Sequence, residues 1–319
     1  MFVAPEAAPL VKRLISFIIP GGGVPYYKGG GPSAEPSLLA LLALQTASRP
    51  GGHAGPGSVP SAPAAPPGPT NSSPASPADG AVAEPAKSLL AWASGLQNAD
   101  GSVGLDPAHR DQGLWLTALA AIVFHHYVVA DRRDLALGFV ASLKSATAPN
   151  DPRIRQDNAL VGWPWVPGTF GWVEPTAWSV VALGVYGRSG DARAAEGAKF
   201  LLDRQIPSGG WNYGNPGLND SELLPFWDTT GLALVALRGR AEAARVRPSL
   251  EFLETNQEKI ESPCGLAWAV MGLENWGRDA ARLRTRLLRA LAAASDETLN
   301  AAHLAAGLIA LSGRKVFAP

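Results

Sequence analysis

Six ten-residue strings of this sequence can be laid under one another, and this internal repeat limits the possible folds more than any other feature. They read EPSLLALLAL from Glu35, RDQGLWLTAL from Arg110, EPTAWSVVAL from Glu174, DTTGLALVAL from Asp228, CGLAWAVMGL from Cys264 and AHLAAGLIAL from Ala302. All six end in a small residue followed by leucine. Each is apolar almost all round, which is typical of a helix buried on most sides, and the small residues let such helices approach closely.

A second kind of segment precedes most of these strings. It has apolar residues at helical spacing with polar residues between them, at 85–97, 135–144, 197–205 and 248–257. This pattern predicts half-buried helices. Because half-buried and fully buried helices alternate, we expect an all-α fold in which about six inner helices are wrapped by about six outer ones.

Residues 47–84 interrupt the repeat and consist almost entirely of Ala, Pro, Gly and Ser. Such a segment buries too little apolar surface to offset the entropy of ordering, so it is predicted to be a disordered linker. Residues 1–46 then supply the first helical pair, and residues 85–319 supply the remaining repeats.

Composition restricts the function and the compartment. Twenty-seven basic residues balance 27 acidic ones without a basic block, so the sequence predicts no nucleic-acid partner. The single cysteine, Cys264, cannot form an internal disulfide. The run LVKRLISFII is too short and too charged to span a membrane. We therefore expect a cytoplasmic protein, with peripheral contact to a membrane surface as the alternative.

The connections between the two kinds of helix also repeat. GVPY, GWPW and GWNY begin at Gly23, Gly162 and Gly210, and Gln97, Gln205 and Gln257 end predicted outer helices. Glycine permits a sharp turn, the bulky residue after it fills the gap between repeats, and glutamine can bond the free backbone groups of a neighbouring helix end.

These connections resemble the glutamine and tryptophan repeat of the terpenoid cyclase and protein prenyltransferase superfamily. KFLLDRQIPSGGWNYG matches that repeat, LLAWASGLQNADGSVG matches it with Ser102 in place of tryptophan, and EFLETNQ keeps only its glutamine half. EPTAWSVVAL and CGLAWAVMGL also look like a segment of squalene-hopene cyclases. The resemblance covers the chain outside the linker and implies an α/α toroid whose inner ring opens onto an apolar cavity.

The same resemblance implies a catalytic acid at Asp228. FWDTTG matches the cyclase stretch Asp-x-Asp-Asp-Thr-Ala, with Asp228 at the proton donor and with Phe226 and Thr229 in place of the flanking acids. The alternative is that Asp228 caps its helix, since Glu35 and Glu174 also stand at helix starts.

The prenyltransferase side of the resemblance implies a zinc site made of Asp228, Cys264 and His303. Ser262 stands where the family has an aspartate, and Asn300 stands at the histidine position. The alternative is a buried, inert cysteine, in which case no cofactor is expected.

Aromatic residues are numerous near the starts of the buried strings. A cavity for an isoprenoid would be lined by aromatic faces, which predicts substrate-binding roles for Trp115, Trp178, Trp227, Trp268 and Phe226. Packing in the core is the alternative for each of them.

The sequence thus predicts a single toroid that binds a long apolar ligand of isoprenoid type. Whether it catalyses cyclisation or prenyl transfer is left open, and complete cyclases and prenyltransferases of this superfamily use a second toroid or a second subunit. The alternative is a non-catalytic binding or scaffold protein.

Overall fold

The computed structural model describes residues 5–48, 77–187 and 190–317 of the 319-residue chain. These residues are mostly helical, as predicted. The odd-numbered helices are α1 (Ala8–Ile15), α3 (Pro77–Gly95), α5 (Ala130–Ser142), α7 (Ala192–Asp203), α9 (Ala243–Thr255) and α11 (Ala281–Ala293). The even-numbered helices are α2 (Ala34–Ser48), α4 (Thr117–His126), α6 (Val173–Val185), α8 (Trp227–Leu237), α10 (Pro263–Asn275) and α12 (Ala301–Ser312).

The remaining elements are short. Three 3-10 turns cover Pro5–Ala7, Leu114–Leu116 and Gln257–Lys259. Strands β1 (Val24–Pro25) and β2 (Pro32–Ser33) pair antiparallel, as do β3 (Gly217–Leu218) and β4 (Ser221–Glu222). Within the described ranges, no helix is both long enough and apolar enough to cross a bilayer.

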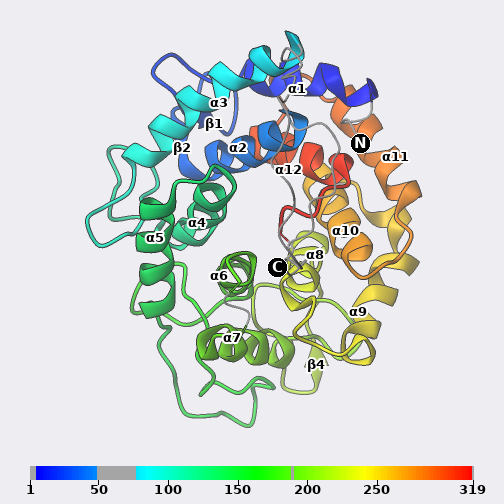
Figure 1. Ribbon diagram of the computed structural model, residues 1–319. Helices are drawn as coiled ribbons and strands as arrows, with labels where there is room; N and C mark the ends of the chain where they lie inside the picture. Colours follow the sequence, from blue (N-terminus) through cyan, green and yellow to red (C-terminus); the bar gives the residue numbers. More distant parts are fainter. Residues whose placement is uncertain (1–4, 49–76, 188–189, 318–319) are drawn as a thin grey trace, which may run out of the picture.

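The helices lie in two layers. The even-numbered helices surround the centre of the molecule and the odd-numbered helices lie outside them (Figure 1). Each inner helix contacts the inner helices before and after it, and α12 contacts α2. The first and last helices of the inner layer are therefore neighbours, although they lie at opposite ends of the sequence.

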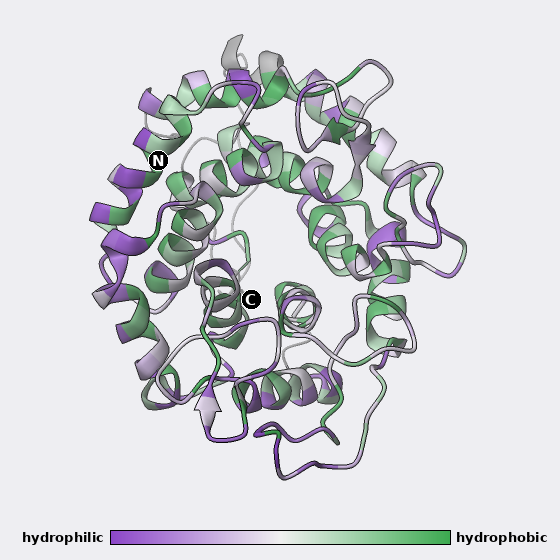
Figure 2. Ribbon diagram, turned by 180° about the vertical axis from the view of Figure 1, so that it is seen from behind, coloured by the Kyte–Doolittle hydropathy of each residue, from purple (hydrophilic) through white to green (hydrophobic). Residues whose placement is uncertain are grey.

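Burial follows this division into layers. In α4, every residue from Thr117 to Phe124 is buried, whereas the outer helix α11 buries only Leu283, Leu287 and Leu291, which share one face. Hydrophobic residues accordingly gather on the helices around the centre, and hydrophilic ones gather on the outer helices and loops (Figure 2). The alternation of fully and half-buried helices in the sequence is reproduced in space.

A repeated hydrogen bond holds the connections to the inner helices. The hydroxyl at the fourth residue of an inner helical segment accepts the backbone N–H of a residue in the preceding connection. The pairs are Ser37 with Val24 (2.8 Å), Thr117 with Val103 (2.9 Å), Thr176 with Trp163 (2.9 Å) and Thr230 with Trp211 (2.9 Å). Leu266 and Leu304 stand at this position in α10 and α12, and because leucine has no hydroxyl group, this hydrogen bond is absent from the last two repeats.

The tryptophans of the connections fill the gaps between repeats. Trp163 and Trp211 are fully buried, and their indole Nε1 atoms donate to the carbonyls of Val140 in α5 and Leu201 in α7, each at 2.7 Å. Two of the three glutamines, Gln97 and Gln205, hydrogen-bond neighbouring segments, but in different ways. Gln97 donates to the Arg132 carbonyl in the first turn of α5, whereas Gln205 donates to the Ser249 hydroxyl.

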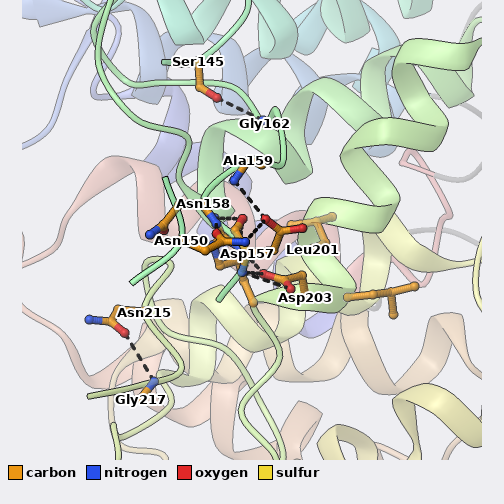
Figure 3. Close-up of polar contacts among 12 residues, drawn as sticks. Ser145, Asn150, Asp157, Asn158, Ala159, Gly162, Leu201, Asp203, Asn215 and Gly217 are labelled. Carbon is orange, nitrogen blue, oxygen red and sulfur yellow. Dashed lines mark hydrogen bonds and ion pairs between the residues drawn. The ribbon is translucent and has the colours of Figure 1, made fainter. Parts of the chain in front are cut away.

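The long connection before α6 is ordered by polar contacts (Figure 3). The Asp157 backbone N–H donates to the Asp203 carboxylate at 3.1 Å, and Asp157 Oδ1 accepts from Asn150 Nδ2 and from the Ala159 N–H, both at 3.0 Å. The Asn158 N–H donates to Asn150 Oδ1 at 2.7 Å. These bonds fix the loop against the end of α7.

Two boundaries differ from those predicted. Helix α2 continues through Ser48 and α3 begins at Pro77, so helices occupy both ends of the predicted linker 47–84, and 49–76 lie outside the described residues. The string at Arg110 is also misaligned, because its first half is a polar loop and α4 begins at Thr117 after a 3-10 turn. Trp115, not Arg110, therefore stands at the repeat position of Glu35.

Small residues permit the closest approach between inner helices. A Cβ atom added to Gly231 of α8 would lie 2.2 Å from the Trp268 carbonyl oxygen of α10, and one added to Gly272 would lie 3.0 Å from the Gly231 Cα. The backbones of α8 and α10 thus pack against each other without intervening side chains.

Gly231→Ala is expected to lower the free energy of unfolding by about 1–3 kcal/mol or more, because the added methyl group meets backbone atoms that have no room to move. Gly138→Ala in α5 is the matched control, since nothing lies within 4 Å of its added Cβ. That change should be neutral or stabilise by up to about 1 kcal/mol. Urea unfolding measures both, and equal stability of the two variants would contradict the close packing.

Candidate functional site

A cavity of about 250 Å³ lies at the N-terminal ends of the inner helices. Its walls come from five of these helices and from two loops. The lining residues are Tyr26, Glu35, Leu39, Glu174, Trp178, Tyr213, Asp228, Thr229, Leu232, Cys264, Trp268, Ala302, His303 and Ala306. Because residues from the first turns of separate helices meet in one cavity, these helices run in the same direction.

The repeat explains which residues reach the cavity. In each of the five helices the second and the sixth residue line it, and residues four apart lie on one face of a helix. The pairs are Glu35 with Leu39, Glu174 with Trp178, Asp228 with Leu232, Cys264 with Trp268, and Ala302 with Ala306. The second positions are mostly polar and the sixth positions are all apolar, so the cavity has a polar mouth and an apolar floor.

Three carboxyl groups occupy the mouth. The Tyr26 hydroxyl donates a short hydrogen bond to Glu35 Oε2, and the Trp165 side chain hydrogen-bonds Glu174. Asp228 Oδ1 accepts the backbone N–H of Thr229 at 2.8 Å. Asp228 therefore satisfies one of the free amides of its helix start, although the N-cap residue of α8 is Phe226.

Burial and mutual repulsion control the protonation of these groups. Burial, followed by the charges of Glu35 and Asp228, raises the pKa of Glu174 to about 8. Burial likewise raises the pKa of Glu35 above its ordinary value, although the Tyr26 hydrogen bond opposes this. Glu174 is therefore mostly protonated at neutral pH and presents an O–H donor to the cavity.

The three residues predicted to bind zinc share the cavity. Asp228, Cys264 and His303 all line it. Among the residues that the structure describes, however, no group of three His, Cys, Asp or Glu side chains is arranged to hold a metal ion. Burial and the neighbouring carboxyl groups raise the pKa of the Cys264 thiol, and a protonated thiol is a poor zinc ligand. Burial lowers the pKa of His303, against the charge of Asp228.

Two of the five aromatic side chains predicted to bind substrate reach the cavity. The rings of Trp178 and Trp268 meet edge to face in its floor, with centroids 5.3 Å apart. Trp227 instead stacks on Phe252 of α9 at 4.8 Å. Phe226 is 40% exposed and packs on Tyr213.

The fifth aromatic, Trp115, lies in the 3-10 turn before α4 and is not among the lining residues. Trp115, Trp227 and Phe226 are thus not among the residues that line this cavity, and their role in substrate binding stays a prediction. The sequence placed them near helix starts but did not fix which face of each helix turns inward.

Sequence reasoning missed the two carboxyl groups with raised pKa values. It treated Glu35 and Glu174 only as support for a capping role of Asp228, yet both face the cavity. The repeated dipeptide Glu-Pro at the second position of α2 and α6 was the available signal. Tyr26 and Tyr213 were missed as well, because they lie in loops whose path depends on the tertiary structure.

Comparison with known proteins shows a similarity of fold only. No family model matches the sequence, and no curated protein matches it. One of the solved structures that match is a protein from Actinoplanes, with a TM-score of 0.59 and 13% sequence identity. The alignment covers 98% of this chain and 99% of that one. At this identity the likeness extends to the fold alone.

Stability should fall as pH rises through the titration of Glu174. The unfolded carboxyl titrates near 4.5 and the folded one near 8, so between these values the folded state holds a proton that the unfolded state has released. The free energy of unfolding then decreases by up to about 1.4 kcal/mol per pH unit. Glu174→Gln has no proton to lose there, so its stability should decrease less over the same range.

Urea unfolding of both proteins between about pH 5 and 9 measures this difference. Glu251→Gln on the outer helix α9 is the control, because its side chain is 58% exposed. The free energy of unfolding of this control should depend on pH as that of the unsubstituted protein does. An identical pH dependence in Glu174→Gln would show that this carboxyl does not hold its proton in the folded state.

Proposed function

We propose that the two helical layers form an α/α toroid of the terpenoid cyclase and prenyltransferase kind, and that the central cavity binds a compact ligand of isoprenoid type. The order of contacts around the inner layer supports this proposal, because each inner helix contacts the next and α12 contacts α2. The glutamine and tryptophan repeat supports it independently through the buried Trp163 and Trp211.

The size and floor of the cavity favour a short hydrocarbon. A volume of about 250 Å³ lies just below the range of roughly 300–1,000 Å³ typical of pockets for drug-sized molecules. Trp178, Trp268, Leu232 and Leu39 offer apolar surface at its lower end. A ligand shorter than the long chain expected from the sequence therefore fits best.

The mouth favours a neutral oxygen at the polar end of the ligand, and this observation carries the proposal. Glu35, Glu174 and Asp228 surround the mouth, and none of the described lining residues is lysine or arginine. A diphosphate would meet these acidic groups without a counter-charge, which costs free energy. A protonated Glu174 can instead donate a hydrogen bond to a hydroxyl or epoxide oxygen.

Acid catalysis is the second candidate, and the protonated state of Glu174 at neutral pH favours it. A carboxyl with a raised pKa holds its proton until a substrate oxygen accepts it, which suits general acid catalysis. The same raised pKa makes Glu174 a weak acid, so protonation of an unactivated alkene has less support. Glu174 thus replaces Asp228 as the proposed catalytic acid. A non-catalytic binding protein remains the alternative.

Calorimetric titration with geraniol, farnesol and geranyl diphosphate tests the binding proposal. Geraniol should bind, and geranyl diphosphate should bind at least about tenfold more weakly. Trp178→Ala should weaken binding of geraniol by about tenfold, because it removes apolar contact area from the floor. Tyr27→Ala changes an exposed loop residue and should leave binding unchanged.

Two further results separate the candidates. Tighter binding of the diphosphate than of the alcohol would contradict the proposal that the mouth of the cavity binds a neutral oxygen. For catalysis, the alcohols and their epoxides are incubated with protein and the products analysed by mass spectrometry. Products that form equally well with Glu174→Gln would exclude Glu174 as the acid, and the absence of products together with binding would favour the non-catalytic role.

A further inference from the structure

The segment that follows α12, Gly313–Phe317, bends toward the centre of the molecule (Figure 1). Val316 is 6% exposed and Phe317 is 5% exposed, although neither belongs to a helix. The Val316 carbonyl oxygen lies 2.8 Å from His126 Nε2 at the end of α4. The segment therefore runs from α12 past the neighbouring helix α2 to the end of α4, where this contact holds it.

Phe317 packs on both tryptophans of the cavity floor. Its ring centroid lies 5.4 Å from that of Trp178, edge to face, and 5.7 Å from that of Trp268, with an interplanar angle of 28°. The three rings form one aromatic cluster. Phe317 does not itself line the cavity, so it supports the floor from the far side.

A second, smaller cavity of about 50 Å³ lies on that far side. It is lined by Phe317 and by the C-terminal halves of α8, α10 and α12, among them Val235, Met271 and Ile309. Phe317 lines this second space and packs on the two tryptophans that line the first, so the three rings lie between the two spaces. Val235, Met271 and Ile309 give this space an apolar side, and Glu274, Asn275, Arg314 and Lys315 line its polar side.

We propose that Phe317 closes the floor of the ligand cavity and thereby sets the greatest length of hydrocarbon chain that the protein accepts. This inference rests on the proposed function, because it concerns the reach of the same ligand. With the phenyl ring removed, Trp178 and Trp268 lose a packing partner, and the vacated volume opens onto the second cavity, whose lining includes the apolar side chains of Val235 and Met271. A chain that passes between the indoles would then gain apolar contacts.

The test compares Phe317→Ala with the unsubstituted protein by titration with geraniol and with the longer geranylgeraniol. The unsubstituted protein should prefer geraniol. Phe317→Ala should reduce this preference by about tenfold or more, mainly through tighter binding of the longer alcohol, whose extra length now gains apolar contacts. Phe200→Ala is the matched control, because Phe200 is also a buried phenylalanine but lies in the outer helix α7. It should lose stability without changing the preference.

Benzene binding provides a measurement that does not depend on the natural ligand. An apolar cavity made by a large-to-small substitution binds benzene. Phe317→Ala should therefore bind benzene, with a chemical shift change at the indole N–H of Trp268, and the unsubstituted protein should not. If no prenyl alcohol binds either protein, the proposed function fails. Benzene binding to Phe317→Ala then still shows whether the Phe317 ring fills the space behind the floor of the cavity.

Two results would overturn the inference. The first is a folded Phe317→Ala protein that keeps the original length preference. The second is a folded Phe317→Ala protein that binds neither benzene nor the longer alcohol. If Phe317→Ala does not fold, Phe317→Leu is used instead, because it removes less volume. It should reduce the preference for geraniol over geranylgeraniol by a smaller factor. An unchanged preference in Phe317→Leu would also contradict the inference.

Discussion

Close packing of apolar helices around one centre is the constraint on which the rest of the structure depends. It requires small residues where backbones touch, as at Gly231 and Gly272 between α8 and α10. Because the packed inner helices run in the same direction, their first turns meet at one end of the molecule. Residues of one repeat position then become neighbours in space, although they are far apart in the sequence.

This convergence creates the electrostatic character of the cavity. Glu35, Glu174 and Asp228 would each be an ordinary helix-start residue in isolation. Here they are brought together and removed from water, and burial, followed by repulsion from Glu35 and Asp228, raises the pKa of Glu174. The mouth therefore combines a protonated carboxyl with the aromatic floor of Trp178 and Trp268 beneath it. This combination is the basis for the proposed neutral ligand with an oxygen at one end.

Parts of this arrangement could be predicted because they are periodic. The buried strings, the half-buried helices between them and the buried Trp163 and Trp211 follow from local patterns of hydrophobicity and from the repeated Gly-Trp connection. The string at Arg110 was misaligned because Ala118 and Leu119, in the first turn of α4, happen to repeat the two letters that end most of the other strings. The site was harder to predict, since a helix apolar all round gives no sign of which face turns toward the centre.

The sequence by itself determined that the chain is mostly helical, that fully buried and half-buried helices alternate, and that acidic residues stand at the starts of several buried ones. Hydrophobic periodicity is a local property, so a single chain is enough to read it. Only the tertiary structure decided that Glu35 and Glu174 share a cavity with Asp228, that Cys264 and His303 line the same cavity, and that Phe317 packs on Trp178 and Trp268. These outcomes depend on the rotation of each helix and on contacts between distant segments, which packing sets for the chain as a whole.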